Sequence, residues 1–179
     1  MKNEFKIQDI TKIALCVALL CVTSFMVIPL PFSPVVISFH TIMVNVIGLL
    51  LKPKAAFYTI LTYLFMGLIG LPVFSAGTAG PGKIFGPTGG YYFGFLLAAV
   101  GISLLKGKKN SFVRYCIITI LVGIPMQHIC AILMMCVYNG GDFTTAFMTI
   151  SLPFLVGDVV KCVMASIIGV SLNRLNRST

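Results

Sequence analysis

Long runs of apolar residues constrain the fold of this chain more than any other feature. Short segments that are basic or rich in glycine and proline separate the runs. A run of about 20 apolar residues is long enough for a helix to cross a bilayer, where each backbone polar group needs an internal partner. Of the 179 residues, 58% are hydrophobic and only 9% are charged. We therefore expect an all-α integral membrane protein that forms a single domain over residues 1–179.

The segments between the runs mark the ends of six predicted transmembrane helices. Prolines 29, 31 and 34 end the first helix, and Lys52-Pro53-Lys54 ends the second, because proline cannot continue a helix. A signal peptide is the alternative for the first run, but no Ala-x-Ala cleavage site follows it. The predicted spans cover residues 10–28, 35–51, 55–71, 89–105, 115–138 and 147–172, approximately.

The basic residues predict the orientation of these helices. With the N-terminus inside, eleven of the 13 lysines and arginines lie on the inner side, while Lys83 lies outside and Lys161 within a span. Inner loops of membrane proteins are enriched in Lys and Arg, so we expect both termini inside a prokaryotic cytoplasmic membrane. The net charge of +9 does not indicate nucleic-acid binding, because these charges do not gather on one face. The inner set is Lys2, Lys6, Lys12, Lys52, Lys54, Lys106, Lys108, Lys109, Arg114, Arg174 and Arg177.

Two charged residues, Asp158 and Lys161, interrupt the last apolar run. Their i,i+3 spacing places both on one face of a helix, where they can pair. A charge at the bilayer centre costs at least about 2.5–3.5 kcal/mol, so such residues usually face a protein interior or a wet cavity. We expect them to bind a ligand in the outward half of the span. The alternative is an ion pair that only locks two helices together.

The segment 72–88 is long for a loop of a membrane protein and contains several glycines and prolines. Its apolar residues Val73, Phe74, Ile84 and Phe85 favour a packed lid on the outer side. Gly86 to Gly90 then open the fourth span, where free N–H groups at a helix start favour an anionic ligand group. The alternative for these glycines is loop and helix-entry geometry alone.

Small residues four apart, Ala14 and Ala18, form a shallow stripe on the first span. Such a stripe lets another helix approach closely in lipid. It therefore predicts either a docking face for a partner helix or internal packing.

Other residue patterns argue against catalysis and metal binding. The chain has no Gly-x-Ser-x-Gly or His-Glu-x-x-His motif and no Walker A sequence, so we expect neither an enzyme nor an ATPase. His40 and His128 lie in different spans without an acidic cluster, and we expect no metal site. Each is interpreted as a core histidine, although His128 beside Gln127 could line a cavity. The six cysteines are interpreted as packing residues.

Several segments, among them the run from Gly86 to Tyr91, together resemble the BioY family of biotin-capture proteins. The most specific is Gly86-Pro87-Thr88-Gly89-Gly90-Tyr91, followed by Gly94-Phe95. The others are the segments 29–35, 70–74 and 157–161, in the order and at the spacing of the family. This resemblance covers residues 10–172 and implies the six-helix fold of an S component of an energy-coupling factor (ECF) transporter.

The resemblance implies a function and partners. S components of this family capture biotin and dock on a transmembrane coupling subunit driven by two ATPases, and a small-residue motif such as Ala14-x-x-x-Ala18 contacts that subunit. Biotin would be the transported ligand, and no cofactor is expected. An S component for another vitamin or precursor, or a structural membrane subunit, are the alternatives.

The chemistry of biotin suits the candidate residues. Asp158 can accept a hydrogen bond from a ureido N–H, and Lys161 can donate to the ureido carbonyl or pair with Asp158. Which polar group meets which end of biotin stays open at this point. The expected binding residues are Asp158, Lys161, Gly86, Pro87, Thr88, Gly89, Gly90, Tyr91, Phe74 and Gln127. Tyr92 is a further candidate for the wall of the site.

Overall fold

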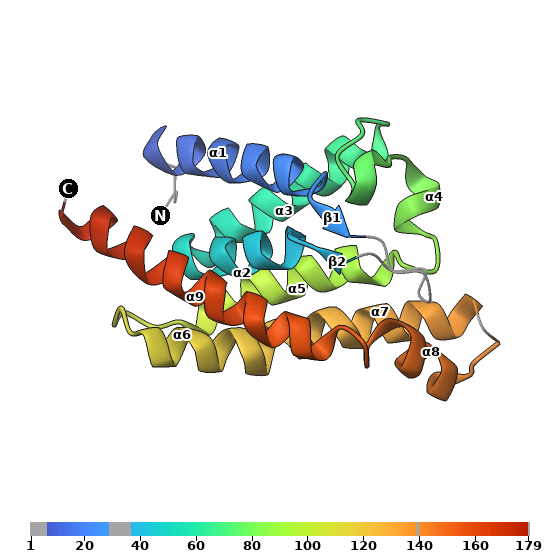
Figure 1. The fold of residues 1–179 in the computed structure, drawn as a ribbon. Helices are drawn as coiled ribbons and strands as arrows, with labels where there is room; N and C mark the ends of the chain where they lie inside the picture. Colours follow the sequence, from blue (N-terminus) through green and yellow to red (C-terminus); the bar gives the residue numbers. More distant parts are fainter. Residues whose placement is uncertain (1–6, 29–36, 139, 179) are drawn as a thin grey trace.

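The computed structural model describes residues 7–28, 37–138 and 140–178 and forms a bundle of helices (Figure 1). Six long helical segments run along the bundle, and they correspond to the six predicted spans. Their bounds are Ile7–Thr23 (α1), His40–Leu50 (α2), Pro53–Leu68 (α3), Gly90–Leu105 (α5), Phe112–Tyr138 (α6, η2 and α7) and Leu155–Ser178 (α9). Segment 29–35, one of the segments that resemble BioY, lies wholly outside the described residues.

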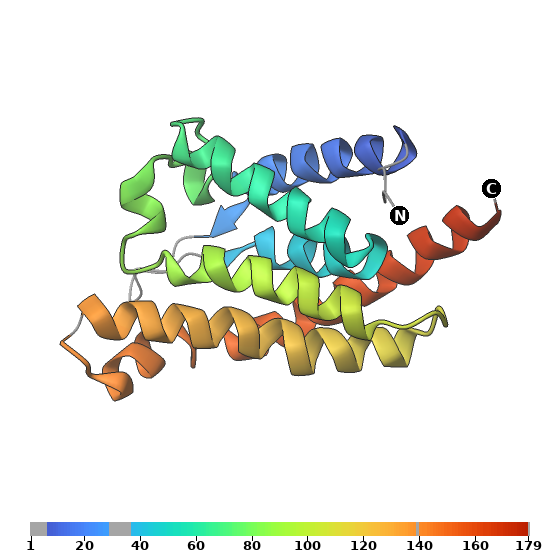
Figure 2. The ribbon, with the colours of Figure 1, turned by 180° about the vertical axis from the view of Figure 1, so that it is seen from behind.

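The start of α1 and the end of α9 lie at the same end of the bundle, as an even number of crossings requires (Figure 1). The turns between α2 and α3 and between α5 and α6 lie at this end as well (Figures 1 and 2). These turns carry Lys52, Lys106, Lys108 and Lys109. Basic residues therefore gather at the end that the positive-inside rule assigns to the cytoplasm.

The outer surface of the bundle is apolar along its length. The described helices Phe112–Tyr138 and Leu155–Leu175 are long and apolar enough to cross a membrane, while α2 and α5 are shorter apolar helices. Large apolar side chains point outward on several helices, with Leu97 50%, Leu121 67% and Leu133 61% exposed. Soluble proteins rarely expose apolar surface of this extent, so the surface fits a lipid environment.

Close approach of helices builds the centre of the bundle, where α5 packs against α2, α3 and α7 (Figure 2). A Cβ on Gly48 of α2 would lie 2.8 Å from Ile102 Cβ of α5. Between them, Val44, Ile47, Ala98 and Ala99 are fully buried or nearly so. Small residues thus let these helices pack at short range.

Polar side chains of α5 and the segment after it cap the carboxyl end of α2. Ser103 Oγ donates to the carbonyl oxygen of Leu51, and Lys106 Nζ donates to those of Leu49 and Leu51. Burial lowers the pKa of Lys106 to about 8, so its ammonium group is still protonated at neutral pH. These bonds satisfy carbonyl groups that a helix end leaves without partners.

The sixth predicted span, 147–172, has the wrong boundaries. The chain forms a short helix α8 (Phe143–Ile150), a turn over 151–154 and then α9. Pro153 explains the break, because proline lacks an N–H and disfavours the helical conformation of the residue before it. Asp158 therefore lies in the first turn of α9, where the helix dipole favours a carboxylate.

The ends of the second and fifth spans also differ from the prediction. The second helix begins at His40 rather than near 35, because Ile37–Ser38 (β2) pairs with Val27–Ile28 (β1) in a short antiparallel ladder. The fifth begins at Phe112 and contains a π-helical stretch, η2 (Thr119–Gly123).

The predicted lid 72–88 is folded and packed. It contains the single turn η1 (Ser75–Gly77) and the short helix α4 (Pro81–Ile84). Val73, Phe74 and Ile84 are buried, as expected, whereas Phe85 is 57% exposed. Phe85 directly follows α4, at the point where the chain turns toward α5, and its side chain faces outward.

Candidate binding site

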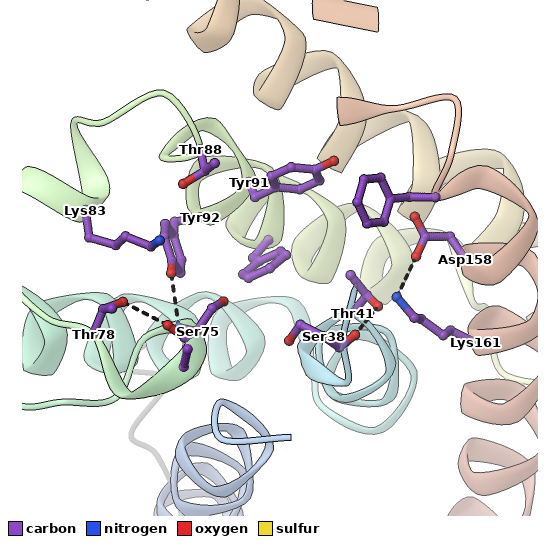
Figure 3. A pocket seen from close by; sticks show the side chains of 13 residues that line it. Ser38, Thr41, Ser75, Thr78, Lys83, Thr88, Tyr91, Tyr92, Asp158 and Lys161 are labelled. Atoms are coloured by element: carbon purple, nitrogen blue, oxygen red, sulfur yellow. Dashed lines mark hydrogen bonds and ion pairs between the residues drawn. The ribbon is translucent and has the colours of Figure 1, made fainter. Parts of the chain in front are cut away.

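A pocket opens at the end of the bundle opposite the termini, between the loop 72–88, α5, α2 and α9 (Figure 3). Its cavity volume is about 130 Å³, below the range of about 300–1,000 Å³ usual for small-molecule sites. The lining residues are Ser38, Thr41, Ser75, Ala76, Thr78, Lys83, Thr88, Tyr91, Tyr92, Phe95, Phe154, Asp158 and Lys161. Aromatic rings and hydroxyl groups thus surround a few charged groups.

Asp158 and Lys161 form the charged wall that α9 contributes. Lys161 Nζ donates to Asp158 Oδ1 over 2.9 Å, which confirms the predicted i,i+3 pair. Both side chains are largely buried, with 9% of Asp158 and 12% of Lys161 exposed. Both residues also line the pocket. The hydrogen-bonding positions that the pair leaves unused are therefore accessible to a ligand.

A second cation, Lys83, lies on the opposite side of the pocket, on α4 (Figure 3). In the described part of the chain, no hydrogen bond or ion pair is found for its ammonium group. Lys83 and Lys161 outnumber the one carboxylate in the lining, Asp158. The pocket therefore favours an anionic ligand.

Aromatic side chains of α5 form another wall. Tyr92 Oη accepts a hydrogen bond from the backbone N–H of Ser75, which ties α5 to the lid. Tyr91 Oη donates to the carbonyl oxygen of Ile150 over 2.5 Å. These bonds hold both rings in place, so the wall is formed before any ligand enters.

Behind Asp158 lies a chain of hydrogen bonds that leads away from the pocket. His128 Nε2 lies 2.8 Å from Asp158 Oδ2, and His128 Nδ1 lies 2.6 Å from Ser151 Oγ. His128 is only 6% exposed. The carboxylate thus has a partner at each oxygen, Lys161 at Oδ1 and His128 at Oδ2.

The glycine motif contributes to the pocket in a different way from the prediction. Thr88 and Tyr91 line the pocket, whereas Gly86, Pro87, Gly89 and Gly90 are not among the described lining residues. A Cβ on Gly89 would lie 1.7 Å from the carbonyl oxygen of Ile84. The visible function of this glycine is close packing, and ligand contact by the four residues stays a prediction.

Two other predicted binding residues lie beside the pocket rather than in its described lining. Phe74 is fully buried and packs against the rings of Tyr63 and Tyr92. Gln127 is 3% exposed, at the contact of α7 with α5. Phe74 therefore supports the aromatic wall from behind.

The predicted docking residues Ala14 and Ala18 lie on the surface of α1. They line an apolar groove between α1 and α3 together with Val17, Thr62 and Met66. Neither alanine lines the pocket that holds Asp158.

The family model of the BioY family matches residues 1–178. This chain belongs to the BioY family. It is 34% identical over 175 residues to the biotin transporter BioY2 of Lactococcus lactis subsp. cremoris, which covers 97% of this chain and 94% of that protein. It is 36% identical over 163 residues to the probable biotin transporter BioY of Pyrococcus horikoshii, with 91% and 94% covered.

A solved structure supports the fold of this BioY family member. The structure is described as the S component for biotin from an ECF-type ABC transporter and superposes with a TM-score of 0.86. It is 26% identical in sequence, and the match covers 97% of this chain and 95% of the other. The chain is therefore a membrane protein with the ECF S-component fold.

Sequence reasoning did not identify several residues of the site. Lys83 was the one basic residue predicted on the outer side, and this isolation was a usable signal. No sequence signal marked Ser38, Thr41 or Phe154 as binding residues, because single hydroxyl and aromatic residues are common in membrane helices. His40, interpreted as a core histidine, is fully buried and bonded to Ser38 and Tyr63.

Proposed function

We propose that this chain is the substrate-binding S component of an ECF transporter and captures biotin at the outer face of a prokaryotic cytoplasmic membrane. The observation that carries the proposal is the buried Asp158–Lys161 pair in the wall of a pocket, in a chain that matches the BioY family throughout. The transporter would cross the membrane six times with both termini inside, in agreement with the distribution of basic residues.

Biotin is a monoanion at neutral pH, with a ureido ring at one end and a carboxylate at the other. The ureido N–H groups suit Asp158, because an ionised carboxylate only accepts hydrogen bonds. Lys161 then donates to the ureido carbonyl while it holds Asp158 in place. The apolar thioether ring lies against Tyr91, Tyr92 and Phe95 in this arrangement.

The valerate carboxylate is assigned to Lys83. This ammonium group lies across the pocket from Asp158 and has no carboxylate among the described lining residues beside it (Figure 3). An ammonium–carboxylate hydrogen bond in a sheltered site is stronger than a neutral one. A ligand with a neutral head and an acidic tail therefore matches both ends of the pocket.

In this proposal, uptake also needs partner subunits that hydrolyse ATP and couple it to transport. The proposed partners are a transmembrane coupling subunit and two ATPase subunits, with Ala14 and Ala18 at the contact. The exposed position of these alanines on an apolar groove supports this assignment, because helices dock in lipid through small residues.

Calorimetry on the chain purified in detergent tests the proposal. We expect saturable binding of one biotin per chain. Competition with other vitamins of similar size separates biotin from a different ligand. If neither biotin nor its competitors bind the folded chain, the protein is a structural subunit and the proposed function is wrong.

A further inference from the structure

His128 is bonded at both ring nitrogens, and its two partners lie on either side of the turn that starts α9. Ser151 Oγ lies 2.6 Å from Nδ1, and Asp158 Oδ2 lies 2.8 Å from Nε2. The imidazole belongs to α7, 30 residues before Asp158 along the chain. It therefore links one helix to the carboxylate of another.

The chemistry of the partners determines the direction of each bond. A carboxylate can only accept, so the Nε2–H of His128 donates to Asp158. In the neutral imidazole, Nδ1 then carries a lone pair, and the Ser151 hydroxyl donates to it. Asp158 thus selects the tautomer that carries a proton at Nε2, and the Ser151 hydroxyl, which can donate or accept, donates to Nδ1.

The two donors leave Asp158 with one orientation. Lys161 occupies one position at Oδ1 and His128 one at Oδ2. A carboxylate has about four acceptor positions in total, so each oxygen keeps one for another donor. Since Asp158 also lines the pocket, these free positions are available to a ligand N–H.

We infer that His128 is a positioning residue for ligand recognition: it holds the Asp158 carboxylate in the orientation that accepts from the ligand. This inference rests on the proposed function. His128 is not among the described residues that line the pocket, so it acts through Asp158 and not by contact with the ligand. The competing interpretation is that the His128 bonds only pin α7 to α9.

A matched pair of substitutions separates the two interpretations. The amide nitrogen of His128→Gln reaches the place of Nε2 and can donate to Asp158. The amide of His128→Asn ends near the place of Nδ1, so it can bond Ser151 but not Asp158. We expect the Gln variant to bind biotin within about threefold of wild type, and the Asn variant to bind about tenfold more weakly or worse, because a hydrogen bond to a charged group is lost.

A double mutant gives a readout that a purely structural role would not produce. In an Asp158→Asn background no carboxylate is left to position. His128→Asn should therefore add little further loss of biotin affinity in that background, whereas a helix pin predicts that His128→Asn also lowers the thermal stability of the protein without ligand. Thr119→Val is the control, because it removes a buried hydroxyl that bonds Tyr115, Cys116 and Ser166 of α9 and does not line the pocket.

Several outcomes would overturn the inference. Wild-type affinity in the Asn variant would do so, and so would equal losses in the Gln and Asn variants. If the Asn variant cannot be purified, His128→Leu, which also leaves Asp158 without the imidazole donor, replaces it, and wild-type affinity there has the same meaning. A wild-type chain that binds no biotin contradicts the proposed function instead, so the two failures are distinguishable.

Discussion

Gly90 of α5 lies against Cys130 of α7 so closely that a Cβ on Gly90 would be 2.1 Å from the carbonyl oxygen of Cys130. The nearest atoms are backbone atoms, which cannot rotate away as a side chain can. Gly94, one turn later, is in the same situation, since its Cβ would lie 2.6 Å from Gln127 Cα. These glycines place α5 at the distance from α7 that sets one side of the pocket.

Gly90→Ala should therefore destabilise the protein before it affects ligand chemistry. Overpacking costs about 1–3 kcal/mol in well-packed interiors, and here the helices must separate. The measurement is the thermal stability of the detergent-purified protein without ligand. Gly82→Ala is the control, because nothing lies within 4 Å of a Cβ there. A Gly90→Ala protein of normal stability that fails to bind biotin would instead support ligand contact at this glycine.

Asp158→Asn should lower biotin affinity at least about tenfold, because hydrogen bonds to a charged group contribute about 1.5–3 kcal/mol. The protein should still insert and fold, since an amide keeps the shape of the side chain. Calorimetry gives the affinity. Asp142→Asn is the matched control, because Asp142 caps α8 by accepting from the backbone N–H groups of Thr144 and Thr145, and Asn caps as well. Loss of the Asp158 variant from the membrane would favour a structural ion pair.

Lys83→Met should weaken the binding of biotin but not that of biotinamide, in which a neutral amide replaces the carboxylate. The substitution keeps the length of the side chain and removes its charge, so only the ammonium–carboxylate interaction is lost. We expect about a tenfold loss for biotin, equal to the removal of one charged hydrogen bond. Lys54→Met, at an exposed position in the first turn of α3 at the other end of the bundle, is the control. Equal losses for both ligands would contradict the assignment of the carboxylate to Lys83.

Replacement of both Ala14 and Ala18 by Leu should separate capture from transport. The added bulk lies on the surface of α1 and not at the pocket, so biotin binding in detergent should be normal. Co-purification with the coupling subunit and ATP-dependent uptake in vesicles should both fail, because close helix approach is blocked. Val113→Leu and Val137→Leu add bulk at other exposed positions, 64% and 78% exposed, as controls. Uptake at the wild-type rate in the Ala14/Ala18 variant would place the docking face elsewhere.

Interactions within one helix could be predicted from the sequence. The Asp158–Lys161 pair is an example, because the geometry of a helix places residues three apart on one face. The six apolar runs and the basic segments between them also gave the order of the helices and the end at which both termini lie. The last span differs from its predicted bounds because Pro153, inside an apolar run, breaks the helix between α8 and α9.

Contacts between helices depended on the tertiary structure. His128 reaches Asp158, and Lys83 faces it across the pocket, only because α7, α9 and the lid pack in one register. That register depends on small residues such as Gly90, which let backbones approach to a distance that no pattern of apolar residues specifies. Thus the sequence by itself determined the membrane class, the family resemblance and the local charge pair. Packing between helices decided which distant polar groups complete the site. The free energy of burying a polar side chain depends on its partners, and here these partners lie far away in the chain.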